Sequence, residues 1–316
     1  MGQALTVELD AQYRQLREEC GLLDRSARGK LLVTGEEGAE YLQGQLTNDI
    51  EALEPGEGCY AALLDRKGHM QGDMRVLRLG PEEIWIDTEP VALEAVRRHL
   101  QTYKIGREVE LEDVSQGRAI LSLIGPRSSE LAGSPPLPPH AGAQSAIAGI
   151  ECLAVGAETG LDLVVSAENA EGLRAAVLDA GAAEVSEAAE ILRIEAGVPR
   201  FGAEMDSSTM PAEAGIVEAA VSFSKGCYIG QETVARLHYR GKPNRHLRGV
   251  RLSAPVPPGT PLSLGEKEVG RVGSSCVSPA HGPIGLAILR REAAPGEALS
   301  AGEDGVTARV ADLPFV

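Results

Sequence analysis

A single cysteine, Cys227, stands in the most distinctive stretch of the chain, Lys-Gly-Cys-Tyr-Ile-Gly-Gln-Glu at residues 225–232. Two glycines in this stretch permit close approach of the backbone, and the residues from Gln231 onward are predicted to be helical. Cys227 would then lie just before a helix N-terminus and beside Lys225, and both conditions favour the thiolate. Because free cysteines are commonly buried and inert, a structural cysteine in a tight turn remains the alternative.

Basic residues gather in and after this stretch, although the chain as a whole has 46 acidic and 30 basic residues and a net charge of -16. Most of the surface therefore repels nucleic acids and anionic membranes. This locally basic stretch predicts either a site that binds carboxylates or phosphates, or a solvated barrel edge at which charge blocks strand pairing. Seven basic residues stand against the single acid Glu232: Lys225, Arg236, Arg240, Lys242, Arg245, Arg248 and Arg251.

Glu195 lies among apolar residues in the stretch Leu-Arg-Ile-Glu-Ala-Gly. A carboxylate in such surroundings is costly unless it is paired. Arg193 or Arg200 could be its partner in a structural ion pair. The functional alternative is a ligand that presents two adjacent N–H donors to the carboxylate.

Several kinds of chemistry are disfavoured by what the sequence lacks. The phosphate-binding, zinc-protease, serine-hydrolase and dinucleotide-binding fingerprints are all absent. The five cysteines lie far apart with no Cys-x-x-Cys, which predicts neither a disulfide framework nor a metal site and fits a reducing cytoplasm. The first ten residues lack the pattern of a signal peptide, and no apolar stretch approaches the roughly 20 residues that cross a bilayer. We therefore expect a cytoplasmic protein without membrane contact.

The first part of the chain is predicted to alternate strands and helices. Thr34 and Glu37 form a possible capping box for a helix through Leu42 and Leu46, and Gly68 can supply the positive φ of a hairpin turn at residues 65–68. Pro90 can occupy the first turn of a second helix. The predicted strands cover residues 30–34, 59–64, 70–79, 84–87, 109–114 and 119–124.

A second α/β unit and a barrel are predicted beyond the proline-rich loop at residues 134–143. A strand at 161–165 precedes helices at 168–180 and 186–196. The short strands at 250–252, 269–277, 284–289 and 306–310 are typical of a small antiparallel barrel. The predicted fold class is α+β with a C-terminal antiparallel β-barrel, in three modules: 1–140, 141–244, which carries the octapeptide, and 245–316.

The octapeptide resembles the hallmark of the YgfZ-type folate-binding proteins, which are relatives of the glycine-cleavage T-protein, an aminomethyltransferase. Residues 41–49, the hairpin at 60–78, residues 194–205 and the C-terminal barrel also resemble this family, in the same order. The resemblance implies a cloverleaf of three mixed α/β modules around a channel that binds tetrahydrofolate or a one-carbon derivative. It also implies a role in making or maintaining iron–sulfur enzymes, including those that thiolate tRNA.

The resemblance also assigns roles to residues. Glu195 matches the glutamate that holds the pterin, and Asp73 matches the acidic residue that aminomethyltransferases keep near the reactive nitrogens of the folate, although a solvent-facing strand residue is the alternative. Aminomethyltransferases tend to have Asp and Phe where this chain has Cys227 and Tyr228, which favours the YgfZ branch and a reactive thiol. The remaining predicted folate contacts are Lys225, Gly226, Tyr228, Gly230, Gln231, Arg236, Tyr60 and Asn48.

Three functions follow as hypotheses. The leading one is a tetrahydrofolate-binding accessory protein whose partners are iron–sulfur client enzymes or assembly proteins, with the basic stretch near the glutamate tail of the folate. The scattered cysteines disfavour a resident cluster. The second is a folate-dependent aminomethyl- or methyltransferase that uses Asp73. The third is an RNA-binding module, which ranks last because aromatic residues are few and the surface is acidic.

Overall fold

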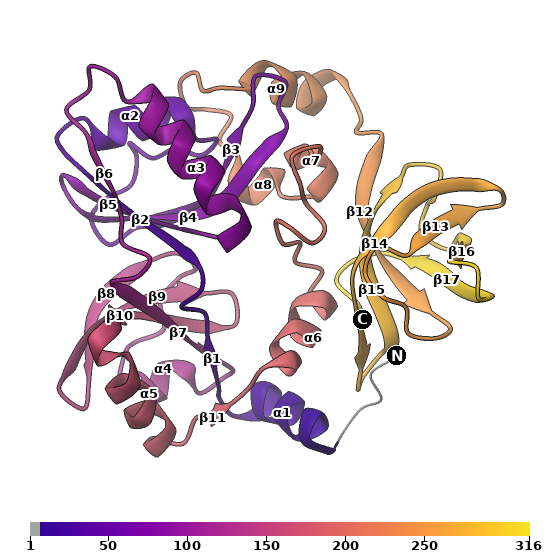
Figure 1. Ribbon diagram of the computed structural model, residues 1–316, viewed down its shortest axis with the longest axis horizontal. Helices are drawn as coiled ribbons and strands as arrows, with labels where there is room; N and C mark the ends of the chain where they lie inside the picture. Colours follow the sequence, from indigo (N-terminus) through magenta and orange to yellow (C-terminus); the bar gives the residue numbers. More distant parts are fainter. Residues whose placement is uncertain (1–6) are drawn as a thin grey trace.

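The computed structural model describes residues 7–316. Its first sheet is antiparallel, with the strand order β3-β4-β5-β2-β6. Helices α2 (Gly38–Gln45) and α3 (Pro90–Tyr103) pack on one face of this sheet over a shared apolar core (Figure 1). The strands are β2 (Gly29–Thr34), β3 (Gly58–Leu64), β4 (Met70–Gly80), β5 (Glu83–Thr88) and β6 (Glu110–Asp113).

Six strands form the second sheet, in the order β11-β1-β7-β10-β9-β8. Helices α4 (Ser128–Leu131) and α5 (Ala170–Asp179) belong to the same module, together with the one-turn helix η1 (Ala167–Asn169). Two of the strands, β1 and β7, come from before residue 140, so strand pairing does not follow the module boundary expected there. The strands are β1 (Gly21–Asp24), β7 (Arg118–Ile124), β8 (Gly142–Ile147), β9 (Ile150–Ala157), β10 (Gly160–Ser166) and β11 (Ala183–Glu184).

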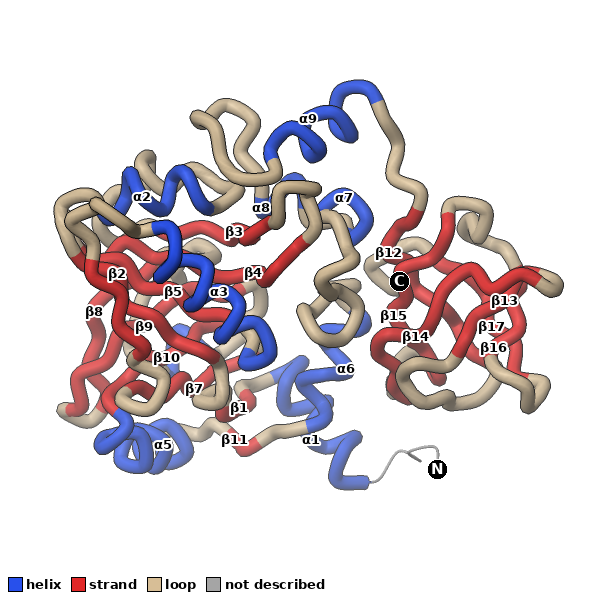
Figure 2. Tube along the Cα trace, turned by 45° about the horizontal axis from the view of Figure 1, so that its top comes forward, coloured by secondary structure: helices blue, strands red, loops and turns tan. Residues whose placement is uncertain are grey.

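The two sheets lie against each other (Figure 2). A small apolar core and a buried ion pair join them. Leu77 and Trp85 of the first sheet contact Ile120 and Val155 of the second. Arg75 on β4 reaches across to Asp162 on β10 of the second sheet. Because β4 is pleated, the residues of this face alternate with those that pack on α3. Asp73, two residues before Arg75 on β4, lies on the same face.

The C-terminal module is a closed antiparallel barrel with the strand order β12-β15-β14-β13-β16-β17. Alternate residues of these strands fill its interior, including Val250, Leu262, Val272 and Leu289. The strands are β12 (Arg245–Leu252), β13 (Pro261–Leu264), β14 (Lys267–Ser278), β15 (Gly282–Arg290), β16 (Ala298–Ala301) and β17 (Val306–Ala311). The structure thereby confirms the predicted α+β fold with a barrel.

Five helices connect these bodies. Helix α1 (Val7–Glu18) packs against α6 (Glu187–Glu195), and α6 also contacts β14 of the barrel. Three further helices lead from α6 to the barrel: α7 (Pro211–Ala214), α8 (Val217–Ala220) and α9 (Gln231–Arg240). Figure 1 shows this connection passing between the two sheets and the barrel.

One local prediction is wrong. Thr34 does not cap α2, because the helix begins at Gly38 with Glu37 as its N-cap residue. The Glu37 carboxylate instead accepts hydrogen bonds from Arg107 and from the backbone N–H of Glu108. A long-range ion pair therefore replaces the expected capping box.

Candidate functional site

Lys225 anchors the octapeptide to the body of the first module. Its ammonium donates to the carbonyl oxygens of Gln43 at 2.5 Å, Leu46 at 2.7 Å and Asn48 at 2.8 Å, in and just after the last turn of helix α2. It also lies 5.1 Å from the centre of the Tyr228 ring. Burial lowers the pKa of Lys225 to about 8. Because an ammonium has three N–H donors, these three carbonyls leave none for a ligand.

The second glycine of the octapeptide permits a close contact with the hairpin between β3 and β4. Gly230 has a φ of +86°, and a Cβ there would come within 2.6 Å of the Asp65 carbonyl oxygen. Only glycine combines this backbone conformation with this approach. Gly226 faces open space, so packing does not require a glycine there. Gly230 precedes α9, and Gln231 is the first residue of that helix.

Cys227 is exposed on the loop between Lys225 and α9. The structure therefore excludes the alternative of a buried cysteine in a tight turn. Among the described residues it is the one exposed cysteine. Burial raises the pKa of the thiols of Cys59 and Cys276 to about 12 and that of Cys20 to about 11, which keeps them protonated at neutral pH.

Asp73 and Tyr60 form a buried pair on neighbouring strands. The Tyr60 hydroxyl donates to Oδ2 of Asp73 at 2.6 Å, whereas Oδ1 of Asp73 has no hydrogen-bond partner among the described residues. Asp73 is 8% exposed, which excludes the solvent-facing alternative. Burial raises the pKa of the Asp73 carboxyl, although the hydrogen bond from Tyr60 opposes this change. The pair thus offers one buried acceptor atom that lacks a donor.

Other groups surround this pair. The imidazole of His140 stacks on the Tyr60 ring, with 6.3 Å between their centres. The charge of Arg28 lowers the pKa of the Asp73 carboxyl and the charge of Glu89 raises it. Arg28 and Glu89 also form an ion pair with each other. Asn48 lies nearby, but its amide is already engaged, because it donates to the carbonyl oxygens of Tyr60 and Ala219. Asn48 therefore positions β3 and α8 and has no donor left for a ligand.

Glu195 lies in a separate cluster between α1 and the barrel. Its carboxylate accepts hydrogen bonds from Tyr13 at 3.1 Å, Arg17 at 2.5 Å and Ser278 at 2.5 Å. The prediction that Arg193 or Arg200 pairs with Glu195 is wrong. Both bind Glu190 instead. The partner of Glu195 comes from a helix at the start of the chain that the sequence analysis did not predict. A pterin could bind this carboxylate only if these donors gave way.

The basic stretch does not form one cluster. Lys225 is buried, Arg245 forms a bidentate pair with Glu213, and Arg251 lies over the Phe315 ring. Arg236 is exposed on α9. The basic residues therefore lie in three different places: Lys225 is a structural anchor, Arg245 and Arg251 lie on the barrel strand β12, and Arg236 lies on the exposed helix α9. They do not form the single anion site that was predicted.

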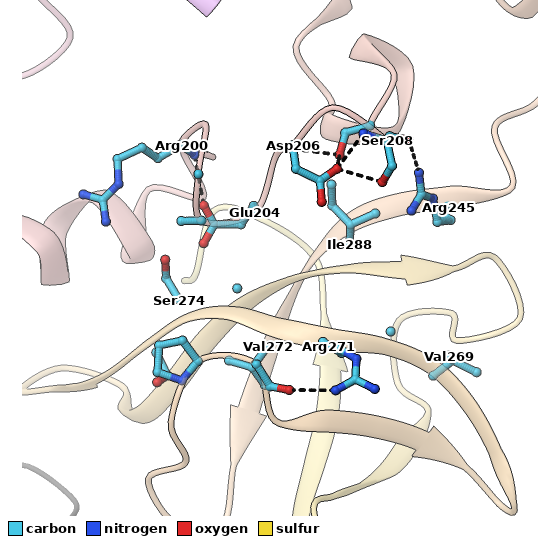
Figure 3. A pocket seen from close by; sticks show the side chains of 18 of the residues that line it. Arg200, Glu204, Asp206, Ser208, Arg245, Val269, Arg271, Val272, Ser274 and Ile288 are labelled. Atoms are coloured by element: carbon cyan, nitrogen blue, oxygen red, sulfur yellow. Dashed lines mark hydrogen bonds between the residues drawn. The ribbon is translucent and has the colours of Figure 1, made fainter. Parts of the chain in front are cut away.

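A cleft of about 960 Å³ lies between residues 200–209 and the barrel (Figure 3). Its polar walls carry both signs of charge, and three of its four arginines are already paired: Arg200 with Glu190, Arg245 with Glu213 and Arg271 with Glu268. Glu204 lies in its wall and pairs with Arg193. Arg200 and Arg245 line this cleft, whereas Glu195, Asp73, Cys227 and the other predicted folate contacts do not.

Among residues 7–316 there is no group of three or more metal-ligating His, Cys, Asp or Glu side chains. None of the helices in this part of the chain is long and apolar enough to cross a membrane.

The chain belongs to the family of the GCVT N-terminal domain, which it matches over residues 3–225. Residues 245–314 match the C-terminal beta-barrel domain of CAF17. These two matches confirm the resemblance to aminomethyltransferases and to the YgfZ-type branch.

Relatives cover nearly the whole chain. An aminomethyltransferase from Rubrobacter xylanophilus is 30% identical over 97% of this chain and 86% of its own length. A putative chloroplastic transferase from Arabidopsis thaliana is 27% identical over 93% of this chain and 71% of its own length. The solved structure of the glycine cleavage system aminomethyltransferase T from Bartonella henselae matches this chain with a TM-score of 0.87 and 22% identity. The match covers 98% of this chain and 89% of the other, which shows that the two share a fold.

Four residues of these sites were missed by the sequence analysis: Tyr13, Arg17, Ser278 and His140. The first two lie on α1, whose apolar residues Leu9, Tyr13 and Leu16 recur at helical spacing, so that periodicity could have revealed the helix. Ser278 and His140 lie at the end of a strand and in a loop, where no local pattern indicates a long-range contact.

Proposed function

We propose that this protein binds a reduced folate at the Asp73–Tyr60 pair. The observation that supports this proposal is the Oδ1 atom of Asp73, a buried acceptor without a donor. A buried carboxylate oxygen left unpaired costs free energy, and a ligand N–H that reached it would remove that cost. Tetrahydrofolate carries such donors on its ring and bridge nitrogens. The relatives named aminomethyltransferase belong to a family whose chemistry uses this cofactor class.

Each residue of the pair has a distinct task in this proposal. Asp73 accepts the ligand N–H through Oδ1, and Tyr60 orients the carboxylate by holding Oδ2. Because burial raises the pKa of Asp73, its carboxylate is a better proton acceptor than an exposed aspartate. A reduced folate, when bound, supplies a carrier of one-carbon groups. Lys225 and Asn48 support the site indirectly by fixing the strand and the loop around it.

We further propose that the protein acts as an accessory factor for iron–sulfur enzymes, with Cys227 as its reactive group. The exposure of this thiol on a loop that Lys225 anchors supports the role, together with the match to the CAF17 barrel and the YgfZ-type octapeptide. Its partners are client enzymes or assembly proteins, including those of tRNA thiolation. A single cysteine cannot hold a stable cluster, so the thiol acts as a nucleophile, a redox relay or a transient ligand.

Asp73→Asn should weaken tetrahydrofolate binding about 10- to 100-fold, because a hydrogen bond to a charged acceptor contributes about 1.5–3 kcal/mol. The measurement is an anaerobic calorimetric titration of wild type, Asp73→Asn and Glu195→Gln. Glu112→Gln, an exposed carboxylate on β6, is the matched control and should bind like wild type.

The Glu195 variant separates two arrangements. If both Asp73→Asn and Glu195→Gln lose affinity for tetrahydrofolate, Glu195 exchanges its present hydrogen-bond donors for those of the pterin, as the resemblance implies. Glu195 and Asp73 then belong to one site. A loss in Glu195→Gln together with normal affinity in Asp73→Asn would contradict a site centred on Asp73. Saturable binding in neither wild type nor the variants would overturn the folate proposal itself.

A second candidate is a folate-dependent aminomethyl- or methyltransferase, favoured by the buried Asp73 and by the names of the relatives. General-base catalysis contributes about 10²- to 10⁴-fold to a rate. If this candidate is correct, one-carbon transfer to tetrahydrofolate from an aminomethylated lipoyl carrier or an N-methyl amine will be measurable, and Asp73→Asn will lower kcat by that factor. Absence of any Asp73-dependent product would leave the accessory role.

A further inference from the structure

Helix α9 and the β3–β4 hairpin turn form one continuous surface. Gly68 in the turn approaches Thr233 on α9 so closely that a Cβ at Gly68 would lie 3.0 Å from the Thr233 Cβ. Arg236 and Arg240 follow Thr233 at helical positions i+3 and i+7, so the three side chains lie along one stripe of the helix. The stripe therefore begins at the hairpin turn and continues toward the barrel.

Exposed cations line this surface. Five of them have side chains with no hydrogen bond or ion pair to any other residue in the range 7–316, and we call these five the basic face: Arg66, Lys67, Arg236, Arg240 and Lys242. The one acid on α9 is Glu232. By contrast, most arginines elsewhere in the described structure are paired with carboxylates. Five unpaired cations on adjoining elements are notable in a chain whose net charge is -16.

Aromatic side chains and the thiol lie on the same elements. The Phe223 ring stacks on His238 of α9 with 3.9 Å between centres, and Tyr239 meets Phe223 edge-on while 69% exposed. Cys227 is exposed on the loop that leads into α9. The contacts of Lys225 and Gly230 hold this loop against the first module. The surface is therefore preorganised, which lowers the entropy cost of binding.

We propose that the basic face, with Tyr239 and Cys227, is the docking surface for an acidic protein whose own thiol or sulfur group meets Cys227. This inference rests on the proposed accessory function and names the kind of partner. Charge complementarity supports it, because the basic face opposes the sign of the rest of the chain and would orient an acidic partner toward the thiol. Tyrosine and arginine are also among the residues that most often anchor protein interfaces.

A nucleic acid is the less favoured occupant. A long polyanion would extend beyond the five cations onto a surface that is acidic overall, whereas an acidic protein patch can match the basic face alone. Base recognition would also require several stacking aromatics, and the whole chain has only ten aromatic residues among Trp, Tyr and Phe.

The test is the rate at which Cys227 attacks two model disulfides. Each probe is a synthetic peptide with one cysteine joined to thionitrobenzoate, and the two peptides differ only in carrying acidic or basic residues. The Cys227 thiolate forms a bond to the peptide sulfur, the original S–S bond breaks, and thionitrobenzoate leaves with the electron pair and is read by its colour. We expect the acidic probe to react about 10- to 100-fold faster at low salt, and the preference to disappear at 1 M salt.

Matched charge reversals complete the test. Arg66→Glu/Arg240→Glu should abolish the preference for the acidic probe, whereas Arg118→Glu/Arg290→Glu, which changes the net charge equally on other exposed surfaces, should retain it. Equal rates for both probes in wild type would overturn the proposal. Protection of Cys227 by transfer RNA that depends on Arg66 and Arg240 would replace the acidic protein with a nucleic acid.

The two proposals fail in different ways. Tetrahydrofolate titrations of Arg66→Glu/Lys67→Glu should match wild type, because neither residue belongs to the Asp73–Tyr60 pair or to the basic stretch of residues 225–251. Absence of tetrahydrofolate binding in the wild-type protein would overturn the proposed folate site and would leave the charge preference at Cys227 unchanged. Loss of the charge preference with intact folate binding would overturn only the docking surface.

Discussion

Replacing Arg75 with methionine is expected to destabilise the protein by about 3–5 kcal/mol, because breaking a buried ion pair leaves an uncompensated charge in the interior. Arg75 is 7% exposed and joins the two sheets. Its Nε donates to Asp87 at 2.7 Å within the first sheet, and its Nη1 donates to Asp162 on β10 of the second sheet at 2.8 Å. Methionine keeps much of the apolar stem and removes the charge.

The two carboxylates would respond differently to the loss of Arg75. Asp87 would retain Arg28 at 2.8 Å and Trp85 at 3.1 Å. Asp162 would retain only Ser122 among the described side chains that donate to it. Most of the cost is therefore expected at Asp162. A double variant, Arg75→Met/Asp162→Asn, should regain part of the lost stability, because it removes the unpaired charge.

The effect should depend on pH. Burial alone would raise the pKa of Asp87, but the charges of Arg75 and Arg28 outweigh it and hold the pKa well below its usual range. A lowered pKa in the folded state contributes stability that is fully present above the unfolded value near 3.8 and is lost as pH falls. The gap between wild type and Arg75→Met should therefore be largest at neutral pH and should narrow below about pH 4.

Thermal unfolding at several pH values measures this prediction, with an expected decrease in apparent Tm of about 10 °C at pH 7. Arg174→Met is the control, because Arg174 pairs with Asp24 and Glu184 near the surface, where ion pairs contribute about 1 kcal/mol or less. Equal losses in the two variants would show that the Arg75 network does not hold the sheets together.

Much of the fold follows from local patterns. The strand at β2, the β3–β4 hairpin with Gly68 in its turn, the helix that begins at Pro90 and the barrel strands β12, β14, β15 and β17 were expected from periodicity and turn residues, whereas the short strands β13 and β16 were not. The capping box failed because the carboxylate of Glu37 has a better partner 70 positions away, in Arg107. Helix α1 was overlooked, although its apolar spacing was visible. Local signals thus predict elements well and long-range ion pairs poorly.

The sites depend on contacts that leave no pattern in the sequence. Lys225 binds three backbone carbonyls, and a carbonyl has no residue identity that a sequence could reveal. The Asp73–Tyr60 bond depends on the register of the hairpin, in which Ala62 faces Asp73 and an irregularity follows Leu63. A hairpin prediction alone does not fix that register. Resemblance drew attention to Asp73 and Glu195, but the structure was needed to find that one has an unpaired oxygen and the other does not.

Cys227→Ala is expected to abolish the ability of this protein to restore iron–sulfur enzyme activity in cells that lack it, while folding and tetrahydrofolate affinity remain at wild-type levels. The thiol is exposed, so its removal should change stability by no more than about 0.5 kcal/mol. Cys227→Ser should fail equally, because a hydroxyl keeps the size and polarity of the side chain but is not a comparable nucleophile or metal ligand.

Two comparisons make this result decisive between the accessory role and the transferase. Ser224→Ala changes another exposed residue, just before the octapeptide, and should restore activity fully. Asp73→Asn in the same cells reports whether folate binding is also required. If Cys227→Ala restores full activity while Asp73→Asn does not, the thiol has no role and the chemistry belongs to the carboxylate, as a transferase requires. If only Cys227 is needed, the folate regulates or stabilises the protein, and the function resides in the anchored loop that presents the thiol to its partner.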